Sequence, residues 1–222
     1  MRRIIAIMVL AGLATWPGTV HADRVTRGPL VQATDVVAGK RAIHLVHSVR
    51  RTDTLLPPPV ARLELRFPPR TRLHAAGSPR CRLGRLQARG PGACPARSRV
   101  GSGSIVGRDL LHPGGVGSTV RIFNGEVLGA RRTVLMSVRP ELGPSFVVVG
   151  RLSGGRRAGP RVDLGFVIAR VPMLGDPSLS DFSLRFDKRF VTAPCPARYR
   201  VTSHFRFSDA GSLTSSDRAR CG

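Results

Sequence analysis

Three residues of the types that serine hydrolases use lie close together in the sequence: Asp109, His112 and Ser118. Such an enzyme needs a histidine hydrogen-bonded to both a serine and a carboxylate. The chain contains no G-x-S-x-G elbow to present the serine, and unrelated polar residues supply similar trios in most chains. We therefore predict no catalytic residue, and we keep a secreted hydrolase with a site assembled from scattered residues as the alternative. A structure that places His112 or His204 against a carboxylate in a concave pocket would favour that alternative.

Carboxylates are too sparse to indicate a glycosidase or a calcium site. A glycosidase needs two carboxylates that flank the bond it breaks, whereas the three glutamates, Glu64, Glu126 and Glu141, are far apart in the sequence. The chain also lacks the D-x-D-x-D loop that is typical of calcium sites. We expect these glutamates to form surface ion pairs.

Metal and nucleotide motifs are equally weak. His44 and His47 are three residues apart on a predicted strand, so their side chains should lie on opposite faces and cannot bind one ion together. The glycines of GSGSIVG at 101–107 have neither the dinucleotide spacing nor the lysine of a phosphate-binding loop. Alternating glycines fit a bulged or closely packed strand better. The sequence therefore predicts no metal and no cofactor.

The cysteines form an even set of four: Cys81, Cys94, Cys195 and Cys221. Three pairings are open, and we predict the one that closes the shortest loops, Cys81–Cys94 and Cys195–Cys221. Zinc is the rival interpretation. A zinc site favours closely paired ligands such as C-x₂-C, while the spacings here are 13 and 26 residues.

The N-terminus has the features of a secretory signal peptide over residues 1–22. Arg2 and Arg3 precede an apolar stretch at 4–13, and Val20-His21-Ala22 provides small residues before a cut at Asp23. The apolar stretch is shorter than the ~20 residues that span a bilayer, and no later segment is apolar enough to do so. We predict a secreted or cell-envelope protein whose mature chain, 23–222, is a single β-sandwich domain.

The charge is strongly basic, with 36 Lys and Arg against 13 Asp and Glu and a net charge of +23. Loss of Arg2 and Arg3 with the signal would leave 23 − 2 = +21. Such a charge favours anionic partners, which include nucleic acid, anionic lipid, teichoic acid and acidic polysaccharide. A GC-rich genome with Arg-rich codon usage explains the same composition, so we leave both interpretations open.

The arginines are spread along the chain, and the tightest groups are doublets. Two of these doublets supply the candidate anion contacts: Arg131, Arg132, Arg156 and Arg157. The only Trp, Trp16, lies in the predicted signal, and the only Tyr, Tyr199, falls on a core face by alternation. Because base recognition on single strands relies on aromatic stacking, we expect binding to be electrostatic and not sequence-specific.

Alternating apolar residues and Gly/Pro turns predict a mainly β protein, an antiparallel β-sandwich or jelly-roll of about ten strands. The predicted strands are Leu30–Val37, Ala42–Val49, Val60–Phe67, Ser98–Gly107, Thr119–Phe123, Arg132–Val138, Phe146–Leu152, Arg161–Ala169, Leu179–Phe186 and Tyr199–Phe207. The apolar run Phe146–Leu152 is typical of a central strand buried on both faces. Asn124-Gly125 predicts a tight turn.

One short helix is predicted over Pro79–Ala88. Ser78 is a suitable cap, proline suits the first helical position, and Gly90 can end the helix.

The cysteine and turn pattern resembles one group of known proteins. CPARSRVGSG at 94–103, FNG at 123–125, APCP at 193–196 and SDAG at 208–211 resemble a group of uncharacterised secreted, disulfide-bonded proteins of high-GC actinobacteria. The resemblance covers most of the mature chain. It implies secretion and a disulfide-bonded β fold, and it implies no activity.

These observations together predict a non-catalytic secreted or cell-envelope protein that binds anionic polymers through a diffuse Arg-rich surface. Besides the hydrolase alternative, we keep a third: a subunit or adhesion protein that adds strands to a partner. A long unpaired apolar edge strand would favour that third alternative.

Overall fold

The computed structural model describes residues 23–27, 30–38, 42–51, 56–155, 159–165, 178–192, 200–209, 211–218 and 220–221. It is mainly β, as predicted, with one α-helix and two 3₁₀ turns between strands. The predicted signal at 1–22 and Tyr199 lie outside the described residues, and the single-domain organisation of 23–222 stays a prediction.

The strands of the described chain alternate with short turns and loops. They are β1 Asp23–Arg27, β2 Leu30–Ala38, β3 Ala42–Arg51, β4 Val60–Arg66, β5 Arg72–Leu73, β6 Arg99–Arg108, β7 Val116–Asn124, β8 Thr133–Pro140, β9 Phe146–Gly155, β10 Gly159–Gly165, β11 Ser178–Asp187, β12 Val191–Thr192, β13 Arg200–Phe207, β14 Ser212–Arg218 and β15 Arg220–Cys221. β5 and β12 form a separate pair, and the other strands belong to one sheet.

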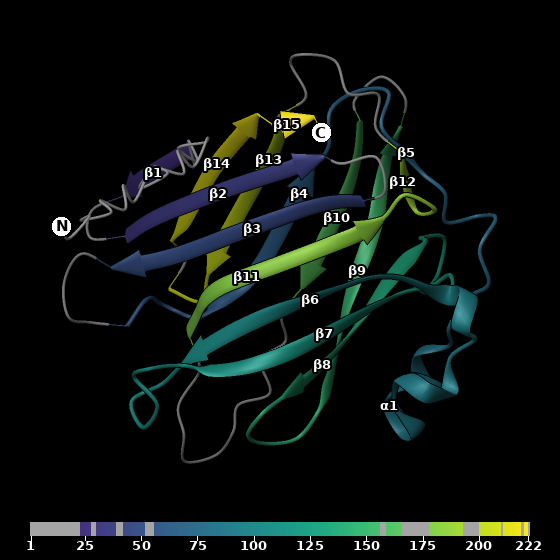
Figure 1. Ribbon diagram of the computed structural model, residues 1–222, viewed down its shortest axis with the longest axis horizontal. Coiled ribbons are helices and arrows are strands. Elements are labelled where there is room, and N and C mark those ends of the chain that lie inside the picture. Colours follow the sequence, from purple (N-terminus) through teal and green to yellow (C-terminus); the bar gives the residue numbers. More distant parts are fainter. Residues whose placement is uncertain are drawn as a thin grey trace, which may run out of the picture.

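The large sheet curls until its two ends meet (Figure 1). Its order is β1-β2-β3-β11-β6-β7-β8-β9-β10-β4-β13-β14, and every pair along this path is antiparallel. β15 then pairs in parallel with β2, and the Val36 N–H donates to Asp217 Oδ2 of β14 at 2.8 Å. The result is a nearly closed, barrel-like sheet. Its terminal strands β1 and β14 have the sequences DRVTR and SLTSSDR, neither of which is a long apolar edge.

The main hydrophobic core fills the inside of this curled sheet. Alternate residues point inward along each strand, as the sequence pattern predicts for half-buried antiparallel strands. Examples are Leu63 and Leu65 on β4 and Leu184 on β11, all with no exposed side-chain surface. His47 on β3 shares this inward face, while His44 lies on the opposite face and contacts Ser183 at 2.8 Å, so the predicted split of the two histidines is confirmed.

The glycines of β6 permit close packing, as predicted. A Cβ atom at Gly101 would lie 2.3 Å from the Arg185 carbonyl oxygen, and one at Gly103 would lie 2.1 Å from that of Ser183. The register also shifts between Arg99 and Gly101. A side chain at either glycine would therefore push β6 away from β11.

A second, smaller core lies on the outer side of the sheet, beneath the helix α1, Leu83–Arg89 (Figure 1). Leu86 is 2 % exposed and clusters with Phe123 of β7 and Leu135 of β8. β8 is consequently buried on both faces from Thr133 to Val138. The sequence assigned that role to β9, but Phe146 is 39 % exposed, and Val147 and Val149 on the outer face of that strand are only half-buried.

The helix begins later than predicted, at Leu83 rather than Pro79. Residue Cys81 instead pairs with β7 in an extended conformation, where its N–H donates to the Asn124 carbonyl at 2.8 Å. The end at Gly90 is confirmed: this residue has φ 71°, and its N–H donates to Leu86 O. Within the described chain no helix is long and apolar enough to span a membrane.

The predicted turn at Asn124-Gly125 is wrong. Asn124 is the last residue of β7, is 1 % exposed, and donates from Nδ2 to the carbonyl oxygens of Ala75, Ser78 and Pro79 at 2.9–3.2 Å. The tight turn lies further on, between Leu128 and Arg131, with Gly129 at φ 60°. Asparagine here ties a distant loop to the sheet and does not reverse the chain.

The disulfide Cys81–Cys94 is present, with its Cα atoms 5.1 Å apart. It confirms the first half of the predicted pairing. Cys195 lies outside the described residues, so the pairing Cys195–Cys221 stays a prediction.

Candidate anion-binding surface

The four arginines predicted to contact anions fall in two places. Arg131 and Arg132 are exposed and lie where the tight turn enters β8. Arg156 and Arg157 lie outside the described residues. The structure therefore tests only the position of the first doublet, and it places both of these side chains at the surface.

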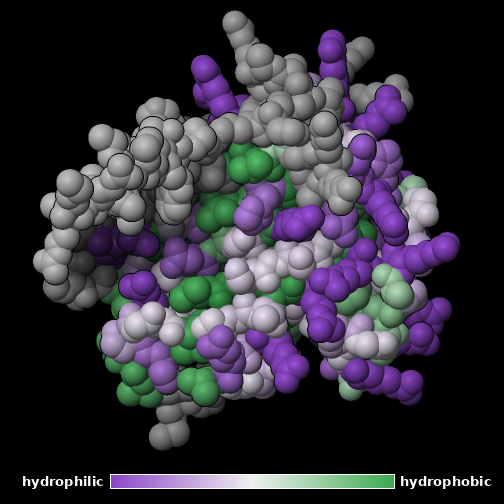
Figure 2. Space-filling view, viewed as in Figure 1, coloured by the Kyte–Doolittle hydropathy of each residue, from purple (hydrophilic) through white to green (hydrophobic). Residues whose placement is uncertain are grey.

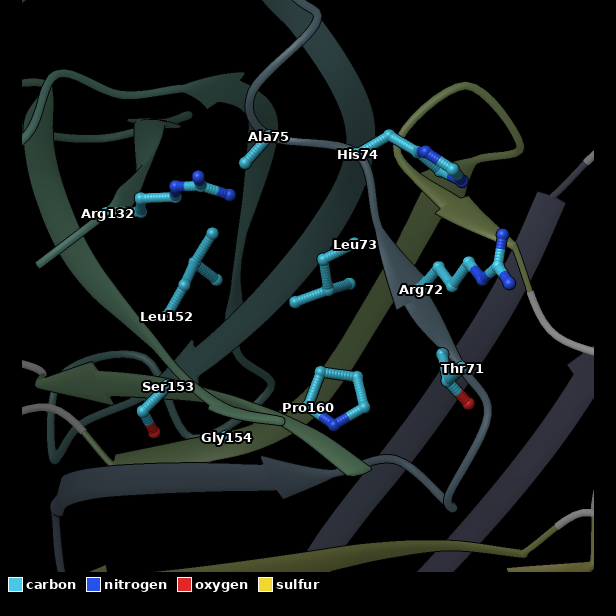
Figure 3. Close-up of a pocket in the computed structure, with 10 residues that line it drawn as sticks. All are labelled: Thr71, Arg72, Leu73, His74, Ala75, Arg132, Leu152, Ser153, Gly154 and Pro160. Atoms are coloured by element: carbon cyan, nitrogen blue, oxygen red, sulfur yellow. The ribbon is translucent and has the colours of Figure 1, made fainter. Parts of the chain in front are cut away.

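Arg132 points into an open hollow of about 530 Å³ (Figure 3). Leu73, Leu152 and Pro160 form apolar walls around it. Arg72 and His74 also border the hollow, but their side chains point away from it. His74 Nε2 instead lies 2.6 Å from Thr192 Oγ1 on the neighbouring strand. The hollow thus presents one inward cation among apolar walls, with Thr71 and Ser153 also in its lining.

A much denser group of cations lies on the segment 80–99, here called the Arg-rich segment. It contains six arginines and no Asp or Glu: Arg80, Arg82, Arg85, Arg89, Arg97 and Arg99. All six are exposed. The sequence analysis missed this group because it looked for adjacent arginines. Counting charges in a 20-residue window would have revealed it.

The fold holds the Arg-rich segment firmly against the sheet. The disulfide Cys81–Cys94 closes the loop that carries α1, and Leu86 anchors the helix in the outer core. The Glu126 carboxylate accepts a hydrogen bond from the Leu83 N–H at 2.7 Å. Because the apolar side of the helix faces the sheet, its arginines must face solvent. Figure 2 shows hydrophilic side chains projecting at the lower right, over α1.

Two acidic side chains on the outer face of β4 and β10 pair with arginines. Glu64 pairs with Arg66 and Arg161 on the outer face of the sheet, and Asp163 pairs with Arg62. The hydrogen bond from Arg62 to Asp163, together with the carboxylate charge, raises the pKa of Arg62. No described carboxylate forms an ion pair with any of the six arginines of the segment.

The trio Asp109, His112 and Ser118 does not assemble into a catalytic site. His112 Nδ1 lies 3.0 Å from Asp109 Oδ1. The same oxygen also accepts hydrogen bonds from the backbone N–H groups of Leu111 and His112, so the Asp109 carboxylate stabilises the loop that contains His112. Desolvation works to raise the pKa of Asp109, and these hydrogen bonds outweigh it and lower that pKa. No hydrogen bond joins His112 to Ser118, although both are described.

The other histidines among the described residues also have structural partners. His204 Nδ1 lies 2.6 Å from Thr214 Oγ1 on the adjacent strand β14. Nowhere among the described residues do three or more His, Cys, Asp or Glu side chains gather closely enough to hold a metal ion.

No protein-family model, curated protein or solved structure matches this chain. The resemblance to the actinobacterial group therefore stays a prediction. The function proposed below depends on the charge and geometry of the chain's own residues.

Proposed function

We propose that this is an exported, non-catalytic β protein of the cell envelope or extracellular space that binds anionic polymers through an Arg-rich surface. The observation that carries the proposal is the surplus of exposed arginines without an acidic partner. The outward ion pairs occupy Glu64 and Asp163, and Asp217 is buried in the seam between β2 and β14. Most of the exposed guanidinium groups in the described part of the chain are left to interact with solvent anions.

Two further observations support binding over catalysis. The His112–Asp109 pair closes its own loop and has no serine within hydrogen-bond reach. The hollow beside Arg132 has apolar walls and a single inward cation. The hydrolase alternative therefore has no support from the geometry of these residues.

Binding to DNA and to teichoic acid, measured against salt concentration, tests the proposal. Each phosphate contact releases counterions, so the logarithm of the binding constant should fall linearly with the logarithm of salt. We expect tighter binding than that of an unrelated protein of equal size and net charge. Equal or weaker binding would overturn the proposal. Export is tested separately by N-terminal sequencing of the released protein, with Asp23 expected as its first residue.

A further inference from the structure

The Arg-rich segment carries a dense group of exposed arginines. Six exposed arginines fall within 20 residues, and no acidic residue interrupts them. The nearest acid described is Glu126, whose carboxylate is engaged by the Leu83 N–H. A polyanion that reaches this segment meets several guanidinium groups at once, whereas on β4 and β10 the arginines are paired with Glu64 and Asp163.

The segment is also preorganised. Arg85 and Arg89 follow an i, i+4 spacing, which places them along one side of the α1 helix, and Arg82 is the residue that precedes its first turn. The disulfide Cys81–Cys94 and the buried Leu86 fix that helix before any ligand binds. Little conformational freedom of the backbone is then lost on binding, which favours affinity.

The side-chain chemistry favours phosphate. Guanidinium groups bind phosphate through two parallel N–H donors, a geometry that lysine lacks, and the segment contains no lysine. It also contains no aromatic side chain for base stacking. Contacts would therefore go to a phosphate backbone and not to bases.

The apolar side chains of the segment argue against a lipid bilayer. Peripheral membrane helices insert exposed leucine or aromatic side chains below the headgroups. Here Leu86 is buried and Leu83 is half-buried against the outer core. The exposed side of α1 offers arginines without an apolar anchor, which suits a hydrated polymer.

We propose that the Arg-rich segment is the docking site for a phosphodiester polymer, held in its binding arrangement by Cys81–Cys94. This proposal deepens the function proposed above and rests on it. The shared chemistry is the phosphodiester backbone, which both nucleic acid and wall teichoic acid carry. Comparison of single-stranded DNA with teichoic acid at one salt concentration distinguishes these two sources by the tighter binder.

A pair of charge-matched variants separates this site from general basicity. The site variant is Arg85→Gln/Arg89→Gln/Arg97→Gln. The control variant is Arg50→Gln/Arg200→Gln/Arg206→Gln, which removes three exposed arginines from β3 and β13. The site variant should lose about tenfold or more in affinity, and its salt slope for single-stranded DNA should fall by about 2, at ~0.7 per phosphate contact. The control should lose less than about threefold by the same estimate.

Two more variants test the chemistry and the preorganisation. Arg85→Lys/Arg89→Lys/Arg97→Lys keeps the charge and removes the planar guanidinium, so it should bind more weakly than wild type but more tightly than the glutamine variant. Cys81→Ser/Cys94→Ser keeps every arginine and frees the loop, so it should also lose affinity. Thermal unfolding of all variants verifies that the sheet is intact.

Each contrary result has its own meaning. If wild type binds no polymer more tightly than the equal-charge protein does, the proposed function itself is overturned. If wild type binds but the site and control variants lose equal affinity, only the docking site is overturned. Tighter binding to heparin, to hyaluronate or to anionic phospholipid vesicles than to either phosphodiester polymer would overturn the phosphodiester assignment.

Discussion

Two polar side chains, Asn124 and His47, are both 1 % exposed, yet they stabilise different parts of this protein in different ways. Asn124 lies at the end of β7 beside Cys81, in the region of the Cys81–Cys94 disulfide and α1 that is called the outer corner here. Its amide donates to three carbonyl oxygens of the loop 75–79. His47 lies inside the curled sheet, with Ser203 Oγ 3.3 Å from its Nε2 and the ring of Phe205 in edge-on contact. Both sites satisfy a buried polar group, as folded proteins must.

The two sites differ in their response to acid. An amide has no charge at any ordinary pH, so the contacts of Asn124 do not change with protonation. Burial lowers the pKa of His47 to about 3, because the interior disfavours the imidazolium ion. The comparison teaches that the outer corner is stabilised independently of pH, whereas the interior carries a group that must remain neutral.

Breaking the cross-link should have the largest effect on the outer corner. The double variant Cys81→Ser/Cys94→Ser opens a loop with a sequence separation of 13 residues, and the loop-entropy model predicts a loss of about 3 kcal/mol in the free energy of unfolding. Denaturant unfolding under oxidising conditions measures it. Trypsin should also cleave the freed segment at its arginines before the rest of the sheet. Wild type under the same oxidising conditions is the reference, and an unchanged unfolding midpoint in the variant would contradict this account.

Removal of the Asn124 amide should have a smaller effect that is the same at every pH. Asn124→Ala leaves buried carbonyl oxygens without their donor, and such groups cost about 2 kcal/mol. Urea unfolding at about pH 7.5 and about pH 5.5 should show equal losses relative to wild type. Thr119→Ala, an exposed change on the same strand, should stay within about 0.5 kcal/mol of wild type. A loss for Asn124→Ala as small as that would show that the amide contacts contribute little.

At mildly acidic pH, His47 should produce the smallest effect of the three, and at neutral pH it should produce none. Because the pKa is lowered in the folded protein, the unfolded chain binds the proton more readily, so stability falls as pH falls from about 6.5 toward about 3 and is unaffected above that range. At about pH 5.5 the loss should be about 1.4 kcal/mol relative to neutral pH. His47→Gln should remove this acid-dependent component, while His204→Gln, on the exposed face of β13, should keep it. Equal pH dependence in wild type and His47→Gln would show that His47 is not the titrating group.

Sequence periodicity predicted the interior well, because inward and outward positions alternate wherever a strand has one buried face. Leu63 and Leu65 on β4 and Phe182 and Leu184 on β11 are inward as expected. Alternation could not predict which strands lie next to each other in the sheet. β4 lies between β10 and β13, and β11 lies between β3 and β6, although these strands are far apart in the chain.

The outer corner was predicted less well, for a local reason. An Asn-Gly pair has the same sequence signature whether it forms a turn or ends a strand. Its role at Asn124 was decided by the loop 75–79, 45–49 residues away. The start of α1 was also decided by a distant contact. Cys81 pairs with the end of β7, so the helix begins at Leu83 and not at Pro79.

The Arg-rich segment, too, could be predicted only in part from the sequence. The positive charge, the scarcity of acids and the spacing of Cys81 and Cys94 can all be read in the sequence. The exposure of the arginines on α1 could not, because it depends on which side of the helix packs on Phe123 and Leu135.

By itself, then, the sequence determined the strand faces, the close packing of β6 and the basic surface, since these follow from side-chain alternation, glycine size and charge. Only the tertiary structure decided the strand order, the loop that Asn124 holds and the outer core beneath α1. Those features depend on contacts between residues distant in the chain, whose free energy is realised only when the whole sheet has formed.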